Sequence, residues 1–158
     1  RRGENFVTRK ITLGVANISA GKQKCLYLGN LDAKRDWGYA RDYVKCMWKI
    51  LQQDEPEDFV IATGVTTTVR EFTQKSFKCI GINLTFKGNG KYEIGVNEET
   101  GDVLVRVHQD YFRPAEVDLL LGNPEKALQK LEWDTSKTSL DSLINEMVEH
   151  DIKRILKN

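Results

Sequence analysis

Two separated stretches of this sequence carry side chains of the types that bind anions. Arg35 stands in the stretch KRDWG, just before a predicted helix, and Arg113 precedes a proline in the stretch RPAE. A planar guanidinium can hold two phosphate oxygens at once, which a lysine ammonium cannot. Glu116 can accept hydrogen bonds from ribose hydroxyls or from a base edge with N–H donors, such as guanine. Together these residue types indicate a nucleotide site.

Each of these residues also has a purely structural interpretation. Asp36 is placed either to orient the Arg35 guanidinium or to cap the following helix, and Trp37 to shield the site from water. The competing interpretation is a solvated turn in which Trp37 fills a gap in the core. The RPAE stretch can equally form a surface ion pair worth ~0–1 kcal/mol. Asn5 either caps the first helix or donates to an anionic ligand at that helix N-terminus.

No catalytic or metal centre is visible in the sequence itself. Residues 88–90 are half of a dinucleotide fingerprint, but Glu93 occupies the position of the third glycine. His108 and His150 are far apart, so neither a metal site nor a nucleophilic triad is indicated. None of the five tyrosines is followed by a lysine four positions later. We therefore expect any function to be binding by this chain, with the chemistry supplied elsewhere.

Composition narrows the class of protein. The chain has 158 residues, enough for a single module. Its 24 Lys and Arg almost balance its 23 Asp and Glu, which gives no electrostatic basis for binding nucleic acid or an anionic membrane. No apolar run approaches the ~20 residues that span a bilayer. Three widely spaced cysteines form neither a disulfide framework nor a metal-binding motif, and they favour a reducing, cytoplasmic compartment.

Periodicity predicts an alternation of helices and strands that positions these residues. The predicted helices cover residues 5–19, 39–52 and 68–80, and a C-terminal segment from 138 or 139. A further short helix is predicted with Asn123 as N-cap, Pro124 as its first residue and an end near Leu131. Residues 40–51 carry one continuous apolar stripe, and Thr68 with Glu71 forms a capping box. The predicted strands lie at residues 25–30, 59–62, 84–86 and 103–107. The pattern indicates a single α/β or α+β module.

Five stretches, in this order, resemble the GDP-mannose 4,6-dehydratases, which are extended short-chain dehydrogenases/reductases. They are RRGENFVTRKIT, GNLDAKRDWGYARDYV, DEPEDFVIATG, VREF and YFRPAEVDLLLGNPEKA, and the resemblance covers almost the whole chain. It implies an α/β fold, namely the C-terminal substrate-binding portion of a Rossmann-like enzyme without its N-terminal dinucleotide-binding part. The start at Arg1, without methionine, fits the expectation that residues 1–158 are one module of a longer two-domain enzyme.

The resemblance also implies roles for individual residues. Arg2 would contact the phosphate region of NADP near a subunit contact, and Asn5 would bind the sugar nucleotide. Arg35 and Arg113 would hold the diphosphate, with Lys34 as a further candidate. Glu116 would contact ribose or guanine. No catalytic residue and no metal ligand is expected within these 158 residues.

The implied activity is that of an NADP-dependent lyase that converts GDP-mannose to GDP-4-keto-6-deoxymannose, the first step of GDP-fucose synthesis. The catalytic Thr, Glu, Tyr and Lys of the family are not in this chain, so we expect it to be inactive alone. Implied partners are GDP-mannose, its own Rossmann half, and further copies in a homodimer or homotetramer. The alternatives are a truncated, non-catalytic protein that binds GDP-sugars or a full-length subunit, and a relative that acts on another nucleotide sugar.

Overall fold

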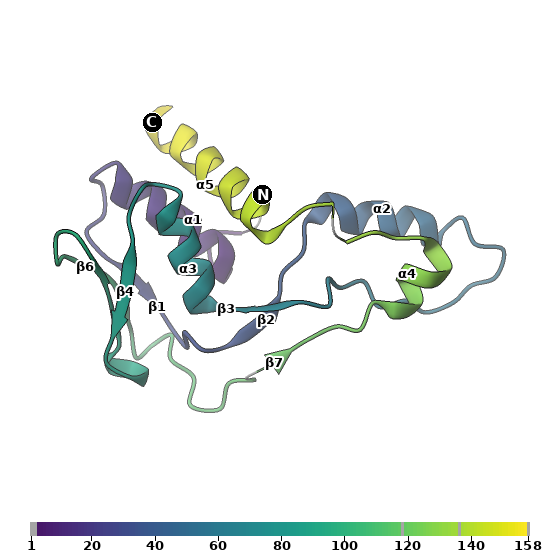
Figure 1. Cartoon of the computed structure of the whole chain (residues 1–158), viewed down its shortest axis with the longest axis horizontal. Helices are drawn as coiled ribbons and strands as arrows, with labels where there is room; N and C mark the ends of the chain where they lie inside the picture. The colour runs from purple at the N-terminus through teal and green to yellow at the C-terminus, as the bar shows by residue number, and fades with distance from the viewer. Residues whose placement is uncertain (1–2, 118, 136, 158) are drawn as a thin grey trace.

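The computed structural model describes residues 3–117, 119–135 and 137–157. Helices and strands alternate along the chain as the sequence predicts (Figure 1). The helices are α1 (Val7–Ser19), α2 (Ala40–Ile50), α3 (Val69–Lys78), α4 (Glu125–Leu131) and α5 (Leu140–Lys157), with a 3-10 helix η1 (Gly90–Tyr92). The strands are β1 (Leu26–Leu28), β2 (Lys34–Asp36), β3 (Thr66–Thr68), β4 (Leu84–Lys87), β5 (Ile94–Asn97), β6 (Val103–Val107) and β7 (Leu119–Leu120).

One end of the molecule is a four-stranded mixed sheet packed with three helices. Its strand order is β1-β6-β5-β4; β1 and β6 are parallel, and the other two pairs are antiparallel. Apolar side chains of α1, α3 and α5 meet those of the sheet in the main core. Phe72, Phe77 and Val105 are fully buried there. Burial of such side chains is worth about 1.5–3 kcal/mol each, so this core holds the C-terminal helix against the rest of the chain.

The other end contains α2 and α4, and a second sheet lies between the two ends (Figure 1). In this sheet, of order β3-β2-β7, the central strand β2 is antiparallel to β3 and parallel to β7. Cys46 of α2 packs with Ala127, Leu131 and Trp133 in a second, smaller core. Lys49 of α2 also donates to the carbonyl of Leu131, at 2.6 Å. The central sheet therefore links two separately packed groups of helices.

Several predicted elements are confirmed. Helices α1, α2, α3 and α5 and strands β1, β4 and β6 lie where the sequence predicts them, and the α/β class is confirmed. The capping box is present, since Thr68 accepts from the Glu71 N–H and the Glu71 carboxylate accepts from the Thr68 N–H. Among the described residues, no helix is both long and apolar enough to cross a bilayer.

Two predictions about individual segments are wrong. Residues 34–36 form strand β2 rather than a turn, because β3 and β7 supply partners on both sides. Residues 59–62 were predicted to be a strand but join neither sheet. A strand needs a neighbouring backbone to satisfy its N–H and C=O groups, and within the described residues this segment pairs with no strand. Helix α4 begins one residue later than predicted, with Pro124 as N-cap and Asn123 accepting from the Glu125 N–H.

Candidate functional site

Arg35 lies in the central strand β2, and its guanidinium is already hydrogen-bonded. Its Nη1 donates to the carbonyls of Lys34 and Val117, each at 2.8 Å, and its Nη2 donates to Glu116 Oε1 at 2.8 Å. The side chains of Arg35 and Glu116 are 20% and 17% exposed. Arginine has five N–H donors, and the described residues accept from three of them. Arg35 therefore links β2 to the segment before β7.

The two neighbours of Arg35 do not act as predicted. Asp36 neither orients Arg35 nor caps α2; its carboxylate accepts from the backbone N–H groups of Thr63 and Gly64, both at 2.9 Å, and from the Thr63 hydroxyl. A carboxylate readily accepts several backbone N–H groups, and the loop at residues 63–64 supplies them here. Trp37 packs edge-on against Phe72, with ring centroids 4.8 Å apart. Trp37 therefore fills a gap in the core, as its structural interpretation predicts.

Arg113 is held by its backbone and leaves its side chain exposed. The side-chain amide of Asn30 donates to the Arg113 carbonyl and accepts from the Arg113 N–H, both at 2.8 Å. In the described part of the chain, the Arg113 guanidinium has no hydrogen bond or ion pair. Pro114 further restricts the backbone of Arg113 to extended conformations. Arg113 is thus an anchored residue with a free cationic group.

The structure brings the two predicted stretches side by side. Residues 30–36 run in the same direction as residues 113–117 and 119–120. They are joined by Asn30 with Arg113, by Arg35 with Glu116, and by the parallel pairing of β2 with β7. Lys34 is exposed, and its backbone pairs with that of Leu119. Because Lys34 and Arg35 are consecutive residues of β2, their side chains project to opposite faces of the sheet.

The remaining predicted residues lie elsewhere or outside the described chain. Asn5 is exposed in a turn two residues before α1, whose N-cap is Phe6, so Asn5 does not cap this helix. Its alternative role as a ligand donor stays a prediction. Arg2 lies outside the described residues. Within residues 3–117, 119–135 and 137–157, no three His, Cys, Asp or Glu side chains gather in a way that could hold a metal ion.

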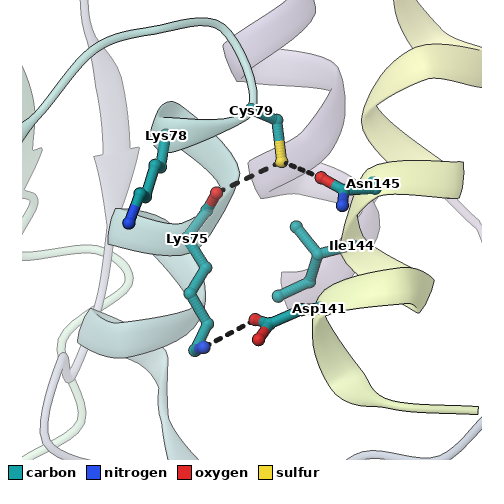
Figure 2. Close-up of a pocket in the computed structure, with 6 residues that line it drawn as sticks. All are labelled: Lys75, Lys78, Cys79, Asp141, Ile144 and Asn145. Carbon is teal, nitrogen blue, oxygen red and sulfur yellow. Dashed lines mark hydrogen bonds and ion pairs between the residues drawn. The ribbon is translucent and has the colours of Figure 1, made fainter.

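A pocket between α3 and α5 contains none of the predicted residues (Figure 2). There Lys75 pairs with Asp141 at 2.5 Å, and the Cys79 thiol lies 2.7 Å from Asn145 Oδ1. Burial raises the pKa of the Cys79 thiol, which disfavours the nucleophilic thiolate. Lys75 with Asp141 and Cys79 with Asn145 thus pair within the pocket, and we do not assign it a function.

Asn30 is the site residue that the sequence analysis missed. The signal was present, because Gly29-Asn30 directly follows a predicted strand, and glycine and asparagine are common where a backbone turns or approaches another closely. A Cβ at Gly29 would lie 2.1 Å from the Tyr111 carbonyl oxygen. This close approach depends on residue 111, far along the chain, so the sequence alone could not reveal it.

Comparison with known proteins gives consistent matches over the whole chain. A family model described as GDP-mannose 4,6 dehydratase matches residues 1–147. Proteins described as GDP-mannose 4,6 dehydratase from Dictyostelium discoideum and Homo sapiens are 57% and 53% identical over 98% and 100% of this chain. The chain covers 43% and 42% of their lengths, so it spans less than half of the curated relatives it matches.

Solved structures share the fold at low sequence identity. RMD from Pseudomonas aeruginosa, complexed with NADPH, has a TM-score of 0.76 and 16% identity over 97% of this chain and 44% of its own. A dTDP-glucose 4,6-dehydratase from Bacillus anthracis, in complex with NAD, has a TM-score of 0.70 and 15% identity over 99% and 42%. At such identities the likeness shows the fold alone, and it confirms the predicted fold class.

Proposed function

The chain belongs to the GDP-mannose 4,6-dehydratase family, and from this premise we propose that it supplies the GDP-sugar-binding half of an NADP-dependent dehydratase. The proposed reaction converts GDP-mannose to GDP-4-keto-6-deoxymannose and water, the first step of GDP-fucose synthesis. The observation that carries the proposal is the parallel arrangement of residues 30–36 with residues 113–117 and 119–120. It joins Arg35 to Glu116 and holds the Arg113 backbone beside Asn30.

In this proposal each side chain has a defined task. The exposed Arg113 guanidinium binds the diphosphate, because it is anchored and has no competing partner in the described part of the chain. Lys34 is a further candidate for binding the diphosphate. Glu116 contacts ribose or guanine, and Arg35 holds Glu116 in place while offering its two remaining donors to the diphosphate. Asn5 contributes a further amide to the sugar nucleotide.

The described residues do not fit a dinucleotide site. The glycine pair at 88 and 90 leads into η1, and Glu93, where a third glycine would stand, forms an ion pair with Arg70. When bound, NADP supplies the redox chemistry of such a reaction. We propose that an N-terminal Rossmann half holds NADP, with Arg2 reaching its phosphate region. This chain then binds and orients the sugar nucleotide but performs no acid–base step, so it would be inactive in isolation.

An exposed apolar surface on α2 supports the proposal of a second half. Four side chains at i, i+3, i+4 and i+7 are 52–79% exposed, and we call them the α2 face: Val44, Met47, Trp48 and Leu51. Contiguous apolar patches of this kind mark surfaces that another polypeptide covers. Residues 59–62, which lack a neighbouring strand, lie at the same end of the molecule (Figure 1). The proposed Rossmann half would cover the α2 face and pair with this segment.

The setting of the complete protein is also proposed. We place it in the cytoplasm as a homodimer or homotetramer, as the family resemblance implies. The alternative, a truncated partner that binds GDP-sugars without turnover, is favoured by the missing Tyr-x-x-x-Lys pair. The intact mass of the natural protein distinguishes them. A protein about twice as long, containing a glycine fingerprint, supports the enzyme; one that starts just before Arg1 supports the partner.

The binding surface is tested with GDP itself. Arg113→Ala in the natural-length protein should weaken GDP binding, measured by isothermal titration calorimetry, by about 1.5–3 kcal/mol, the range for hydrogen bonds to charged groups. Arg113→Lys should restore only part of this loss, because an ammonium cannot reproduce the fork. Lys153→Ala, an exposed charge on α5, serves as the control. Equal GDP affinity in Arg113→Ala and the parent would refute the proposed surface.

A further inference from the structure

We propose that Asn30 is a positioning residue that acts through Arg113 on GDP-sugar binding. This inference rests on the proposed function and adds a residue that the family resemblance did not indicate. It starts from the way the Asn30 side chain is used. Both ends of its amide bind the backbone of one residue, 83 positions away in the sequence. Asn30 makes this paired contact with no other described residue.

The geometry of the pair requires an amide. The Nδ2 group donates to the Arg113 carbonyl and Oδ1 accepts from the Arg113 N–H, each at 2.8 Å. Among side chains of this length, only asparagine carries a donor and an acceptor on one planar group. The contact copies the exchange of two hydrogen bonds between paired residues in an antiparallel sheet. It thereby fixes the backbone of Arg113 on both sides of its Cα atom.

Neighbouring contacts anchor the same segment from its other end. The N–H of His108 donates to the Leu28 carbonyl, at the end of β1, at 2.9 Å. The backbone at Gly29 lies against that of Tyr111, and a Cβ there would come within 2.1 Å of the Tyr111 oxygen. Residues 108–113 therefore follow residues 28–30 closely, and Asn30 is the last contact before the backbone of Arg113 continues into Pro114.

The consequence concerns the conformational cost of binding. The Arg113 side chain is exposed and has no partner in the described residues, so only its backbone limits where its guanidinium can reach. Holding the backbone in place before the ligand arrives removes part of the ordering cost that binding would otherwise bear. Arg35 differs, because its guanidinium is itself held by Glu116 and two carbonyls. Asn30 thus orders Arg113 through its backbone, whereas direct hydrogen bonds order the guanidinium of Arg35.

The test is a double-mutant cycle on GDP affinity in the natural-length protein. Asn30→Asp keeps the size and the acceptor but replaces the donor with an oxygen that faces the Arg113 carbonyl. Loss of one net hydrogen bond should weaken GDP binding about 3- to 10-fold. In the Arg113→Ala background the same substitution should leave the affinity unchanged within about 2-fold, because residues that act through one another are not additive.

Two further variants separate positioning from general stability. Asn30→Ser removes both contacts without adding charge, and it replaces Asn30→Asp in the double-mutant cycle if that variant does not fold. Asn97→Asp makes the same chemical change in the β5–β6 turn, where Oδ1 only accepts from the Glu99 N–H, and should leave GDP affinity unchanged. Thermal unfolding of every variant shows whether the folded state persists.

The outcomes distinguish this inference from the proposed function. If Arg113→Ala binds GDP like the parent, the proposed surface itself is wrong. If Arg113→Ala weakens binding but folded Asn30→Asp and Asn30→Ser do not, only the positioning role is overturned. An equal loss from Asn30→Asp in the parent and in the Arg113→Ala background also overturns it, since Asn30 would then act by another route. Loss confined to the parent background supports it.

Discussion

Arg35 and Glu116 form an ion pair at 2.8 Å although 81 positions separate them in the sequence. Both were predicted as ligands of one nucleotide, and the structure shows that they bind one another. The pair is mostly shielded from solvent, and Arg35 also donates to two backbone carbonyls. A diphosphate that approaches Arg35 must therefore use its remaining donors or displace Glu116. By contrast, the Arg113 guanidinium has no hydrogen bond or ion pair to any residue that the structure describes.

The first prediction concerns this ion pair. Arg35→Met removes the counter-charge of Glu116, which keeps only the Val117 N–H as a donor, and the donor of the Val117 carbonyl. The free energy of unfolding should therefore fall by about 1–3 kcal/mol. The double variant Arg35→Met/Glu116→Leu should lose less than Arg35→Met alone, because no unpaired charge remains. Urea denaturation measures both.

The matched control lies on the surface of α5. Lys153 and Glu149 form an exposed pair at 3.5 Å, and Lys153→Ala should change the free energy of unfolding by less than about 1 kcal/mol. If Arg35→Met were as stable as this control, the pair would contribute nothing to joining β2 and the segment before β7.

Local sequence signals predicted the elements whose determinants lie close together in the chain. The capping box needs only Thr68 and Glu71, three positions apart, and it is confirmed. Helix α2 follows from its continuous apolar stripe. The family resemblance singled out both Arg35 and Glu116, because each stands in a stretch that matches the family, and the two are in contact. Their role as ligands stays a prediction.

The misassigned segments depend on partners far along the chain. Residues 34–36 are charged and have weak strand preference, yet they form the centre of a sheet because Thr66–Thr68 and Leu119–Leu120 lie beside them. Residues 59–62 have strong strand preference but no neighbouring strand in the described structure. Asp36 was assigned to Arg35 because it is adjacent in sequence, whereas the N–H groups that it accepts belong to the loop at 63–64.

The second prediction is a pH dependence at the start of α3. The backbone and hydroxyl hydrogen bonds from Thr68 lower the pKa of Glu71 below its usual value of 4.5. Because the folded-state pKa lies below the unfolded one, this carboxylate stabilises the fold above about pH 4.5, and the contribution is lost as pH falls through the folded-state value. Glu71→Gln should flatten this part of the stability–pH profile.

The measurement is urea denaturation at a series of pH values on both sides of pH 4.5. Glu99→Gln, an exposed substitution in the turn after β5, controls for the loss of one acidic charge. A Glu71→Gln profile that kept the slope of the parent would show that Thr68 does not stabilise the charged form of Glu71.

The third prediction concerns the α2 face in the natural-length protein. If the proposed Rossmann half covers it, Met47→Lys places a charge in an apolar contact, and the free energy of unfolding should fall by about 2 kcal/mol or more. Lys45→Ala, an exposed position two residues before Met47 and outside the α2 face, should change it by less than about 0.5 kcal/mol. A Met47→Lys protein as stable as Lys45→Ala would mean that the α2 face stays in solvent.

The fourth prediction concerns the attachment of α5 to α1. Asp151 is fully buried, forms an ion pair with Arg9, and accepts from the Thr12 hydroxyl at 2.8 Å. Arg9 is 4% exposed, so both charges are held in a nearly dry contact between the two helices. Asp151→Asn leaves the Arg9 guanidinium buried without its counter-charge, and the free energy of unfolding should fall by about 3–5 kcal/mol.

A double variant distinguishes the effect of the Arg9–Asp151 ion pair from the effect of burying a charge without its partner. Arg9→Met/Asp151→Leu removes both charges and fills the space with apolar atoms, so it should be more stable than Asp151→Asn. In this double variant the Thr12 hydroxyl loses its carboxylate acceptor but can still donate to the backbone carbonyl of residue 9, at 3.3 Å. Any remaining loss of unfolding free energy relative to the parent then measures that lost hydrogen bond. Urea denaturation followed by circular dichroism at 222 nm measures all variants. If the double variant were the less stable, the charges themselves would hold α5 in place, and apolar packing around Ile144 and Val148 would not be sufficient for its attachment.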